Sequence, residues 1–210
     1  MSVPHGKNPV TSPHGTDSGP SDDEILDLVA GGRHLAFDLI VARYGGRTRR
    51  YLRQIVGTDA SLDDLTQEVF VRIFRGAHLR RRKGTFPVWL YRVARSIAVD
   101  HIRRAQADRR VRARVEEELQ TAPGRSSTPL DRVQSREFEE SFQRALASLP
   151  EEFRTPFLLR EQERLSYDQI AEVLDTSAKT ISTRIHRARR RLRGLLAPFL
   201  PAYGGGREAP

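Results

Sequence analysis

The residues of this chain that could do chemistry fall into an acidic group and a basic group. Asp63, Asp64 and Glu68 could bind a metal or form an acid/base pair. However, no histidine lies at ligand spacing from them, and no nucleophile or glycine-rich phosphate loop is nearby. Carboxylates at the start of a helix are explained by their favourable interaction with the helix dipole. We therefore expect no catalytic residue, no metal site and no cofactor.

The basic group lies in residues 165–193, LSYDQIAEVLDTSAKTISTRIHRARRRLR, which contain no acidic residue after Asp175. A cationic surface of this kind binds phosphate and other polyanions. A solvated basic face on a purely structural helix is the alternative. The cationic residues of the group are Lys179, Arg184, Arg187, Arg189, Arg190, Arg191 and Arg193.

Two short helices should position these cations. Ser166 and Gln169 have the spacing of a capping box, which opens the first helix. Residues 175–177 interrupt the apolar pattern, and Ser177 is suited to cap the second helix. Two helices around a tight turn, the second one basic, predict a helix-turn-helix that reads DNA. The expected buried stripe of the second helix is Ile181, Ile185, Ala188, Leu192 and Leu195.

The composition agrees with a nucleic-acid partner. The 210 residues include 36 Lys and Arg against 27 Asp and Glu, a formal net charge of +9. This surplus favours polyanions through counterion release but carries no sequence preference. The chain has no cysteine, which excludes disulfides and thiolate chemistry. No apolar run reaches membrane-spanning length and no hydrophobic signal core is present, so we expect a cytoplasmic protein without membrane insertion.

The N-terminal part reads as a polar tail followed by helices. Residues 1–20 carry almost no large apolar side chains, and we expect them to be disordered. Capping boxes are expected at Ser21 with Glu24 and at Ser61 with Asp64. Glycine pairs at 31–32 and 45–46 should interrupt the helices. Nothing alternates with period two, so the sequence predicts an all-α fold without a sheet.

Residues 78–104 combine basic and aromatic side chains. A basic loop, 78–84, precedes a helix that contains Phe86, Trp89 and Tyr91 among arginines. Positive charge interleaved with aromatic rings suits single-stranded nucleic acid, because bases stack on the rings. The alternative is that the rings belong to the core. We assign Trp89 to the core and leave both interpretations open for Phe86.

A change of composition separates a second helical domain. Residues 105–137 are first charged and then rich in Pro, Gly and Ser, which indicates a flexible linker with a possible helical start. A new apolar pattern begins near Phe138. Pro150 should lie in the first turn of a further helix, and Pro156 within it predicts a kink or a late start. The C-terminal tail, 198–210, should fray.

Two separated segments resemble the extracytoplasmic-function sigma factors of bacterial RNA polymerase. DDLTQEVFVRIFR resembles the core-binding helix of region two, and FPVWLYRVARSIAVDHIRR resembles the adjoining segment that melts the promoter and reads its minus-10 element. LASLPEEFRTPFLLREQERLSYDQIAEVL through RIHRARRRLR resembles region four. The resemblance implies a region two domain at 21–104, a linker at 105–137 and a helix-turn-helix domain of region four at 138–197.

The resemblance also implies roles for individual residues. Asp64, Gln67 and Glu68 would dock on the clamp helices of core polymerase, which replaces the explanation of these acids as helix-start residues. Contacts to bases or backbone of the minus-35 duplex would come from Lys179, Thr180, Ser182, Thr183, Arg184, His186 and Arg187. Of these, Lys179, Thr180 and Arg184 would mainly contact the backbone. The melted minus-10 strand would lie along Phe86, Arg92, Arg95, Ser96 and Asp100.

The chain departs from the family pattern at three positions. Ser96 stands where asparagine is common, and Ser182 where lysine or arginine is frequent, so the resemblance carries no base preference over to these two positions. Asp175 replaces a frequent turn glycine. The expectation is a promoter-specificity subunit that binds polymerase as a monomer, leaves the chemistry to it and is regulated by an anti-sigma factor. A free-standing helix-turn-helix transcriptional regulator is the alternative.

Overall fold

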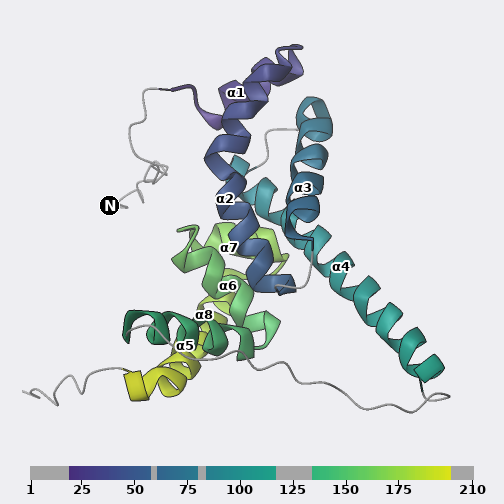
Figure 1. Ribbon diagram of the computed structural model, residues 1–210. Coiled ribbons are helices and arrows are strands. Elements are labelled where there is room, and N and C mark those ends of the chain that lie inside the picture. The colour runs from purple at the N-terminus through teal and green to yellow at the C-terminus, as the bar shows by residue number, and fades with distance from the viewer. Residues whose placement is uncertain (1–18, 58–60, 80–83, 117–133, 200–210) are drawn as a thin grey trace, which may run out of the picture.

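The computed structural model describes residues 19–57, 61–79, 84–116 and 134–199 (Figure 1). These residues form helices and contain no strand, which confirms the all-α prediction. The first group of helices is α1 (Asp22–Ala30), η1 (His34–Ala36), α2 (Phe37–Val56), α3 (Leu62–Gly76), η2 (Ala77–Leu79) and α4 (Phe86–Glu116). The second group is α5 (Gln134–Ser148), α6 (Glu151–Glu161), α7 (Tyr167–Leu174), α8 (Ala178–Leu196) and η3 (Ala197–Phe199).

The helix starts agree with the sequence at two of the three expected capping boxes. Ser21 with Glu24 opens α1, and Ser166 with Gln169 opens α7, each with both reciprocal hydrogen bonds. Ser61 precedes α3 but makes no capping hydrogen bond with its side chain, so the third box is wrong. The reason is the backbone, because Ser61 has a ψ of 77° whereas Ser21 and Ser166 are extended at 160° and 162°.

The two glycine pairs behave differently. Gly31 and Gly32 end α1 as expected, with Gly32 at a φ of +92° that favours glycine. The expected break at residues 45–46 is wrong, because α2 continues through them to Val56. Buried residues on both sides of the pair, Tyr44 and Thr48, fix the helix by tertiary packing, which outweighs the low helix propensity of glycine.

The segment that joins the two groups is helical at both ends. α4 continues to Glu116 and α5 begins at Gln134, so both helices reach into the stretch predicted to be a linker. The rest of that stretch, 117–133, lies outside the described residues, as do most of the two predicted tails. Pro150 is the N-cap of α6, and Pro156 is buried inside this helix, which therefore does not start late. No helix in the described ranges is long and apolar enough to cross a membrane.

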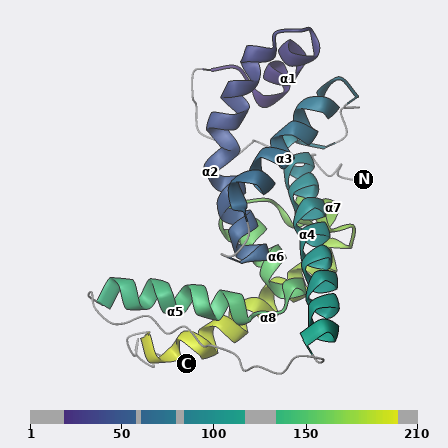
Figure 2. The ribbon, with the colours of Figure 1, turned by 45° about the vertical axis from the view of Figure 1, so that its right-hand side comes forward.

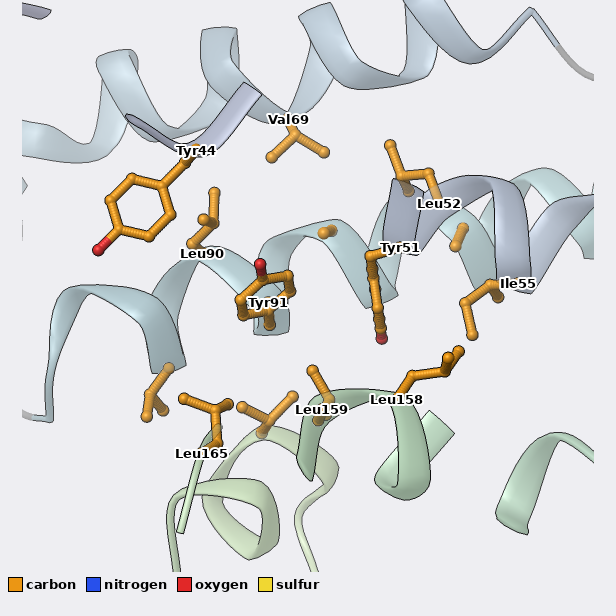
Figure 3. Packing of buried hydrophobic residues seen from close by; sticks show 14 of the residues in the cluster. Tyr44, Tyr51, Leu52, Ile55, Val69, Leu90, Tyr91, Leu158, Leu159 and Leu165 are labelled. Atoms are coloured by element: carbon orange, nitrogen blue, oxygen red, sulfur yellow. The ribbon is translucent and has the colours of Figure 1, made fainter. Parts of the chain in front are cut away.

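The two groups of helices share one continuous apolar core, which the sequence did not predict. Figure 2 shows α6 and α7 of the second group beside α2 and α4 of the first. Tyr51 on α2 and Leu90 on α4 are fully buried in the same cluster as Leu158, Leu159 and Leu165 of the second group. Figure 3 shows these side chains facing one another between the two sets of helices. The contact places α7 against α4 and α6 against α2. The helix-turn-helix is thus packed on the first domain.

Candidate nucleic-acid and polymerase interfaces

The turn between α7 and α8 has the geometry of a helix-turn-helix. α7 ends at Asp175, which adopts the left-handed conformation with φ 51° and ψ 57°. Ser177 then caps α8 by accepting a hydrogen bond from the backbone N–H of Thr180 at 3.1 Å. The predicted buried stripe is confirmed except at its end, where Leu196 is buried and Leu195 is half exposed. Around the helix axis, Leu196, four residues after Leu192, lies closer in angle to Leu192 than Leu195 does.

The outer face of α8 presents most of the residues expected to read the minus-35 duplex. Thr180 and Arg184 are half-buried, and the other five are exposed. Thr180 belongs to the cap, because its hydroxyl lies 2.8 Å from that of Ser177. Arg184 lies 3.9 Å from Glu152, a long and weak ion pair. The exposed members of the set are Lys179, Ser182, Thr183, His186 and Arg187.

The exposed arginines of α8 differ in whether they have a partner within the second domain. Arg189 donates to Glu161 on α6 at 2.7 Å, and this hydrogen bond raises the pKa of its guanidinium. Arg191 lies over the ring of Phe153, with its guanidinium carbon 4.9 Å from the centroid. Arg187 and Arg190 make no ion pair with any described residue and remain available to a polyanion.

The aromatic part of the expected minus-10 surface is corrected by the structure. Phe86 is only 2% exposed and packs edge-to-face against Tyr44, with ring centroids 5.0 Å apart, and against Trp89 at 6.1 Å. A base cannot stack on a ring that is buried in this way. We therefore assign Phe86 to the core. Trp89 is partly buried against the same core, as expected.

The polar part of the minus-10 surface lies along α4, and its two arginines face the second domain. Arg92 donates to the backbone carbonyl of Glu172 on α7 at 2.6 Å and lies 3.5 Å from the carboxylate of that residue. Arg95 lies 3.6 Å from Glu151 at the start of α6. Ser96 is exposed, and Asp100 is half-buried one turn further along the helix.

The expected polymerase-docking residues lie on the outer face of α3. Asp64 and Gln67 are exposed, and Glu68 is half-buried and pairs with Arg72 at 2.5 Å. An open apolar groove of about 440 Å³ between α2 and α3 reaches this face. Its lining residues are Phe37, Val41, Gly45, Asp63, Thr66, Gln67, Phe70, Val71 and Phe74. The described part of the chain contains no cluster of three or more acidic or histidine side chains that could hold a metal.

A buried ion pair between the two domains was missed by the sequence analysis. Arg47 on α2 lies 2.8 Å from the carboxylate of Glu163, whose side chain is 2% exposed. Burial, with a further contribution from Glu163, raises the pKa of the nearby Tyr91. Burial likewise raises the pKa of Tyr51. No local spacing could have revealed the pair, because its partners are more than a hundred residues apart in different helical patterns.

Comparisons with known proteins agree with this architecture. Residues 40–108 match the family Sigma-70 region 2, and residues 139–192 match the family Sigma-70, region 4. The chain is 30% identical over 185 residues to the ECF RNA polymerase sigma-E factor of Haemophilus influenzae, covering 86% of this chain and 97% of that protein. It is 34% identical over 165 residues to the ECF RNA polymerase sigma factor SigE of Mycolicibacterium smegmatis, covering 77% of this chain but only 62% of the relative.

A solved structure shares the fold. The structure of CnrH in complex with the cytosolic domain of CnrY superposes with a TM-score of 0.63 at 23% identity, covering 84% of this chain and 97% of that one. The region 2 match precedes the region 4 match in the chain, and together they include α3, most of α4, α6, α7 and most of α8. The chain therefore belongs to the extracytoplasmic-function (ECF) sigma factors of RNA polymerase.

Proposed function

We propose that this chain directs core RNA polymerase to a set of promoters by docking through α3, reading the minus-35 duplex through α8 and holding the melted minus-10 strand along α4. The observation that carries the proposal is the presence of both sigma regions in one chain. A free-standing regulator would need only the helix-turn-helix. Catalysis belongs to the polymerase, and the chain acts where the polymerase does, in the cytoplasm.

The minus-35 assignment is supported by the surface of α8. Exposed Ser182, His186 and Arg187 lie within one and a half turns of the helix, so a single major groove can receive them together. Lys179 and Arg184 flank them and supply charge for the phosphates. The buried stripe of α8 holds this face outward.

The minus-10 assignment is supported by the row of polar residues on α4. Arg92, Ser96 and Asp100 follow one another at steps of four residues and so share one face of the helix. Arginines can hold the phosphates of a single strand, while Ser96 and Asp100 offer hydrogen bonds to bases. With Phe86 in the core, this face is polar rather than aromatic.

The docking assignment is supported by the combination of charge and apolar surface on α3. Asp64 and Gln67 are exposed beside a groove lined by Phe70 and Val71, which gives an acidic rim around an apolar centre. Protein interfaces commonly have this arrangement. We further propose that a protein of the anti-sigma class regulates the chain, because a protein of similar fold, the sigma factor RpoE of Bartonella quintana, has been solved in complex with the anti-sigma factor NepR.

Titration of core polymerase with labelled protein, followed by permanganate footprinting, tests the proposal. Reactive thymines should appear on a selected promoter only when both core and this chain are present. Specific promoter binding by the chain alone, without any opening in the presence of core, would reject the assignment.

A further inference from the structure

The C-terminal end of α4 extends beyond the packed part of the molecule. Among residues 86–108, Ile102 is the last side chain packed against the apolar core. α4 nevertheless continues to Glu116, so residues 103–116 add about 21 Å of helix at about 1.5 Å per residue. Figure 1 shows this end of α4 projecting away from the other helices. Tertiary packing therefore does not account for this part of the helix.

The protruding end of α4 is strongly basic. Residues 103–114 contain six arginines and a single acidic residue, Asp108. Arg103 and Arg104 are exposed and make no ion pair with any described residue. Like charges spaced four residues apart, such as Arg110 and Arg114, destabilise a helix, and a bound polyanion would remove this repulsion. The function proposed above for α4 uses none of these charges.

The register of the α4 backbone continues the minus-10 face into this end of the helix. The first part of this face carries Arg92, Ser96 and Asp100, which are assigned to the minus-10 strand, and its last three positions are arginines. Positions 104 and 109 lie outside the face. At about 100° per residue, one sector of about 80° contains positions 92, 96, 100, 103, 110 and 114.

The order of the elements in the chain gives the direction of this face along the promoter. α4 is followed by the helices of region four, whose α8 is assigned to the minus-35 duplex. The C-terminal end of α4 therefore lies on the minus-35 side of the residues that hold the minus-10 strand. Arg110 lies about 21 Å beyond Ser96 along the helix axis, which corresponds to about six base pairs at about 3.4 Å each.

The chemistry of this end favours the backbone of double-stranded DNA as its ligand. No phenylalanine, tyrosine or tryptophan occurs in residues 103–116, so the segment offers no ring on which an unpaired base could stack. The exposed side chains of residues 103–108 include no large apolar one, whereas protein interfaces commonly have an apolar centre. Arginines without either feature bind phosphates and carry no sequence preference by themselves.

We propose that residues 103–114 of α4 bind the phosphates of the double-stranded DNA directly upstream of the minus-10 element. The inference rests on the proposed function of α4 and α8. Arg103 lies nearest to the minus-10 residues, and Arg110 continues the same face about two turns further along. The contact adds affinity for a promoter without reading its sequence, so the DNA between the two elements contributes to binding.

Removing two charges from this face provides the first test. In Arg103→Gln/Arg110→Gln two phosphate contacts are lost, and each contributes about 0.9 units to the salt slope of duplex binding. Binding of holoenzyme to a promoter should therefore lose about two units of slope. Between about 50 and about 200 mM salt, the affinity of the unaltered chain should fall about tenfold more than that of the variant. Circular dichroism checks that the helix content is unchanged.

Two further variants identify the chemistry of the contact. Arg103→Lys/Arg110→Lys keeps both charges and should keep the salt slope, because lysine also binds phosphate. Arg104→Gln/Arg109→Gln removes the same charge from positions outside the face and should change the slope much less. A slope reduced equally in the two glutamine variants, or reduced in the lysine variant, would contradict the assignment of this face to phosphates.

A shortened template tests whether the partner is the upstream duplex. A fork template that begins at the minus-10 element, with that element single-stranded, offers no duplex to the end of α4. Holoenzyme with the unaltered chain and holoenzyme with Arg103→Gln/Arg110→Gln should bind this template equally well. A difference that persists on this template, or a lower affinity of the variant for core, would place the contact on the melted strand or on the polymerase and overturn the proposal.

Local cleavage of the DNA tests where this end of α4 lies on the promoter. The chain has no cysteine, and Ala107 is exposed about 60° from Arg92 around the helix axis, within the same sector. An iron chelate attached at Ala107→Cys generates hydroxyl radicals, which should cut the duplex directly upstream of the minus-10 element. The same chelate at Asp38→Cys on α2 should not cut there. Absence of upstream cuts with the chelate on α4 would also overturn the proposal.

These outcomes separate the inference from the proposed function. If the unaltered chain and core fail to open the promoter, the proposed function fails, and the inference falls with it. If they open the promoter while Arg103→Gln/Arg110→Gln keeps the full salt slope, the phosphate contact of α4 is rejected and the proposed function stands.

Discussion

The guanidinium of Arg47 on α2 lies 2.8 Å from the carboxylate of Glu163, which follows α6, so residues of the two sigma regions form a buried ion pair. The side chain of Glu163 is 2% exposed and that of Arg47 is 28% exposed. The contribution of this pair to the free energy of unfolding therefore differs from that of the exposed ion pairs elsewhere in the molecule. Breaking the pair lowers the free energy of unfolding most when the carboxylate stays buried without its cation.

Arg47→Ala should lower the free energy of unfolding by about 3 kcal/mol, because it leaves Glu163 buried without its cation. Urea denaturation followed by circular dichroism measures the change. Arg49→Ala is the matched control, since its partner Asp63 is 84% exposed. The control should cost less than about 1 kcal/mol. Similar losses in both variants would show that Glu163 is not buried in solution.

Reversing charge on the docking face should weaken polymerase binding without unfolding the chain. Asp64→Lys/Glu68→Lys places cations beside the groove between α2 and α3, and we expect core affinity to fall by at least about tenfold. Fluorescence titration with labelled protein measures the affinity, and circular dichroism reports the fold. Glu140→Lys/Asp168→Lys makes the same charge change on other exposed surfaces and should leave core binding nearly unchanged. Equal weakening by both double variants would contradict the assignment of α3.

Arg187 and Arg184 should have different effects on minus-35 binding. Arg187 is exposed, and its replacement by alanine should cost about 1–3 kcal/mol at the preferred sequence and flatten discrimination between sequences. Arg184 is half-buried near Glu152, and Arg184→Ala should weaken all duplexes alike and reduce the salt slope by about one unit. Holoenzyme binding to matched and mismatched promoters at several salt concentrations measures both. Uniform loss in both variants would remove Arg187 from the base-reading set.

Local sequence patterns predicted the parts of the fold that local forces determine. The caps at Ser21, Ser166 and Ser177 depend on residues within three positions, and all three are confirmed. The continuation of α2 through residues 45–46 could not be predicted, because buried Tyr44 and Thr48 hold that part of the helix through contacts distant in sequence. The same applies to Phe86, because its burial depends on packing against Tyr44 on another helix.

The sequence predicted which residues of the candidate sites lie at the surface of their helices, but it did not predict which of them contact the other domain. Lys179, His186 and Arg187 are exposed on one helix, as periodicity and the family resemblance predicted. That Arg92 and Arg95 touch the other domain could not be foreseen, since charge and spacing on α4 are the same whether the domains are apart or together. The packing between the domains depends on how two surfaces fit together. It produces no periodic pattern in the sequence of either domain.

Asp175→Gly should stabilise the helix-turn-helix by about 0.5–1 kcal/mol, because glycine adopts the left-handed conformation at lower cost than aspartate. Asp175 has φ 51° and ψ 57° at the end of α7. Thermal unfolding measures the gain. Asp168→Gly is the control, because Asp168 lies in the first turn of α7, where glycine should instead cost up to about 1 kcal/mol. A loss of stability in Asp175→Gly would mean that the carboxylate makes a contact that outweighs the backbone term.

Three buried tyrosines should ionise only well above pH 10, and two of them, Tyr51 and Tyr91, should report the packing between the two domains. Burial raises the pKa of Tyr44, Tyr51 and Tyr91 above the ordinary value of 10.0, with a hydrogen bond to Asp22 adding to the effect at Tyr44. A raised pKa means that the folded state favours the neutral phenol. This contribution to stability is fully present below pH 10 and is lost as the pH rises through the raised values.

Absorbance at 295 nm during an alkaline titration measures these ionisations. In Glu151→Gln/Glu163→Gln/Glu172→Gln the domains should separate, which exposes Tyr51 and Tyr91 to water and returns their pKa values toward 10. Tyr44 should keep its raised pKa, because it packs against Phe86 and donates to Asp22 within the first domain. Tyr44→Phe in the triple variant identifies the remaining late ionisation. An unchanged titration curve in the triple variant would mean that Tyr51 and Tyr91 stay buried, and that the three ionic contacts do not hold the domains together.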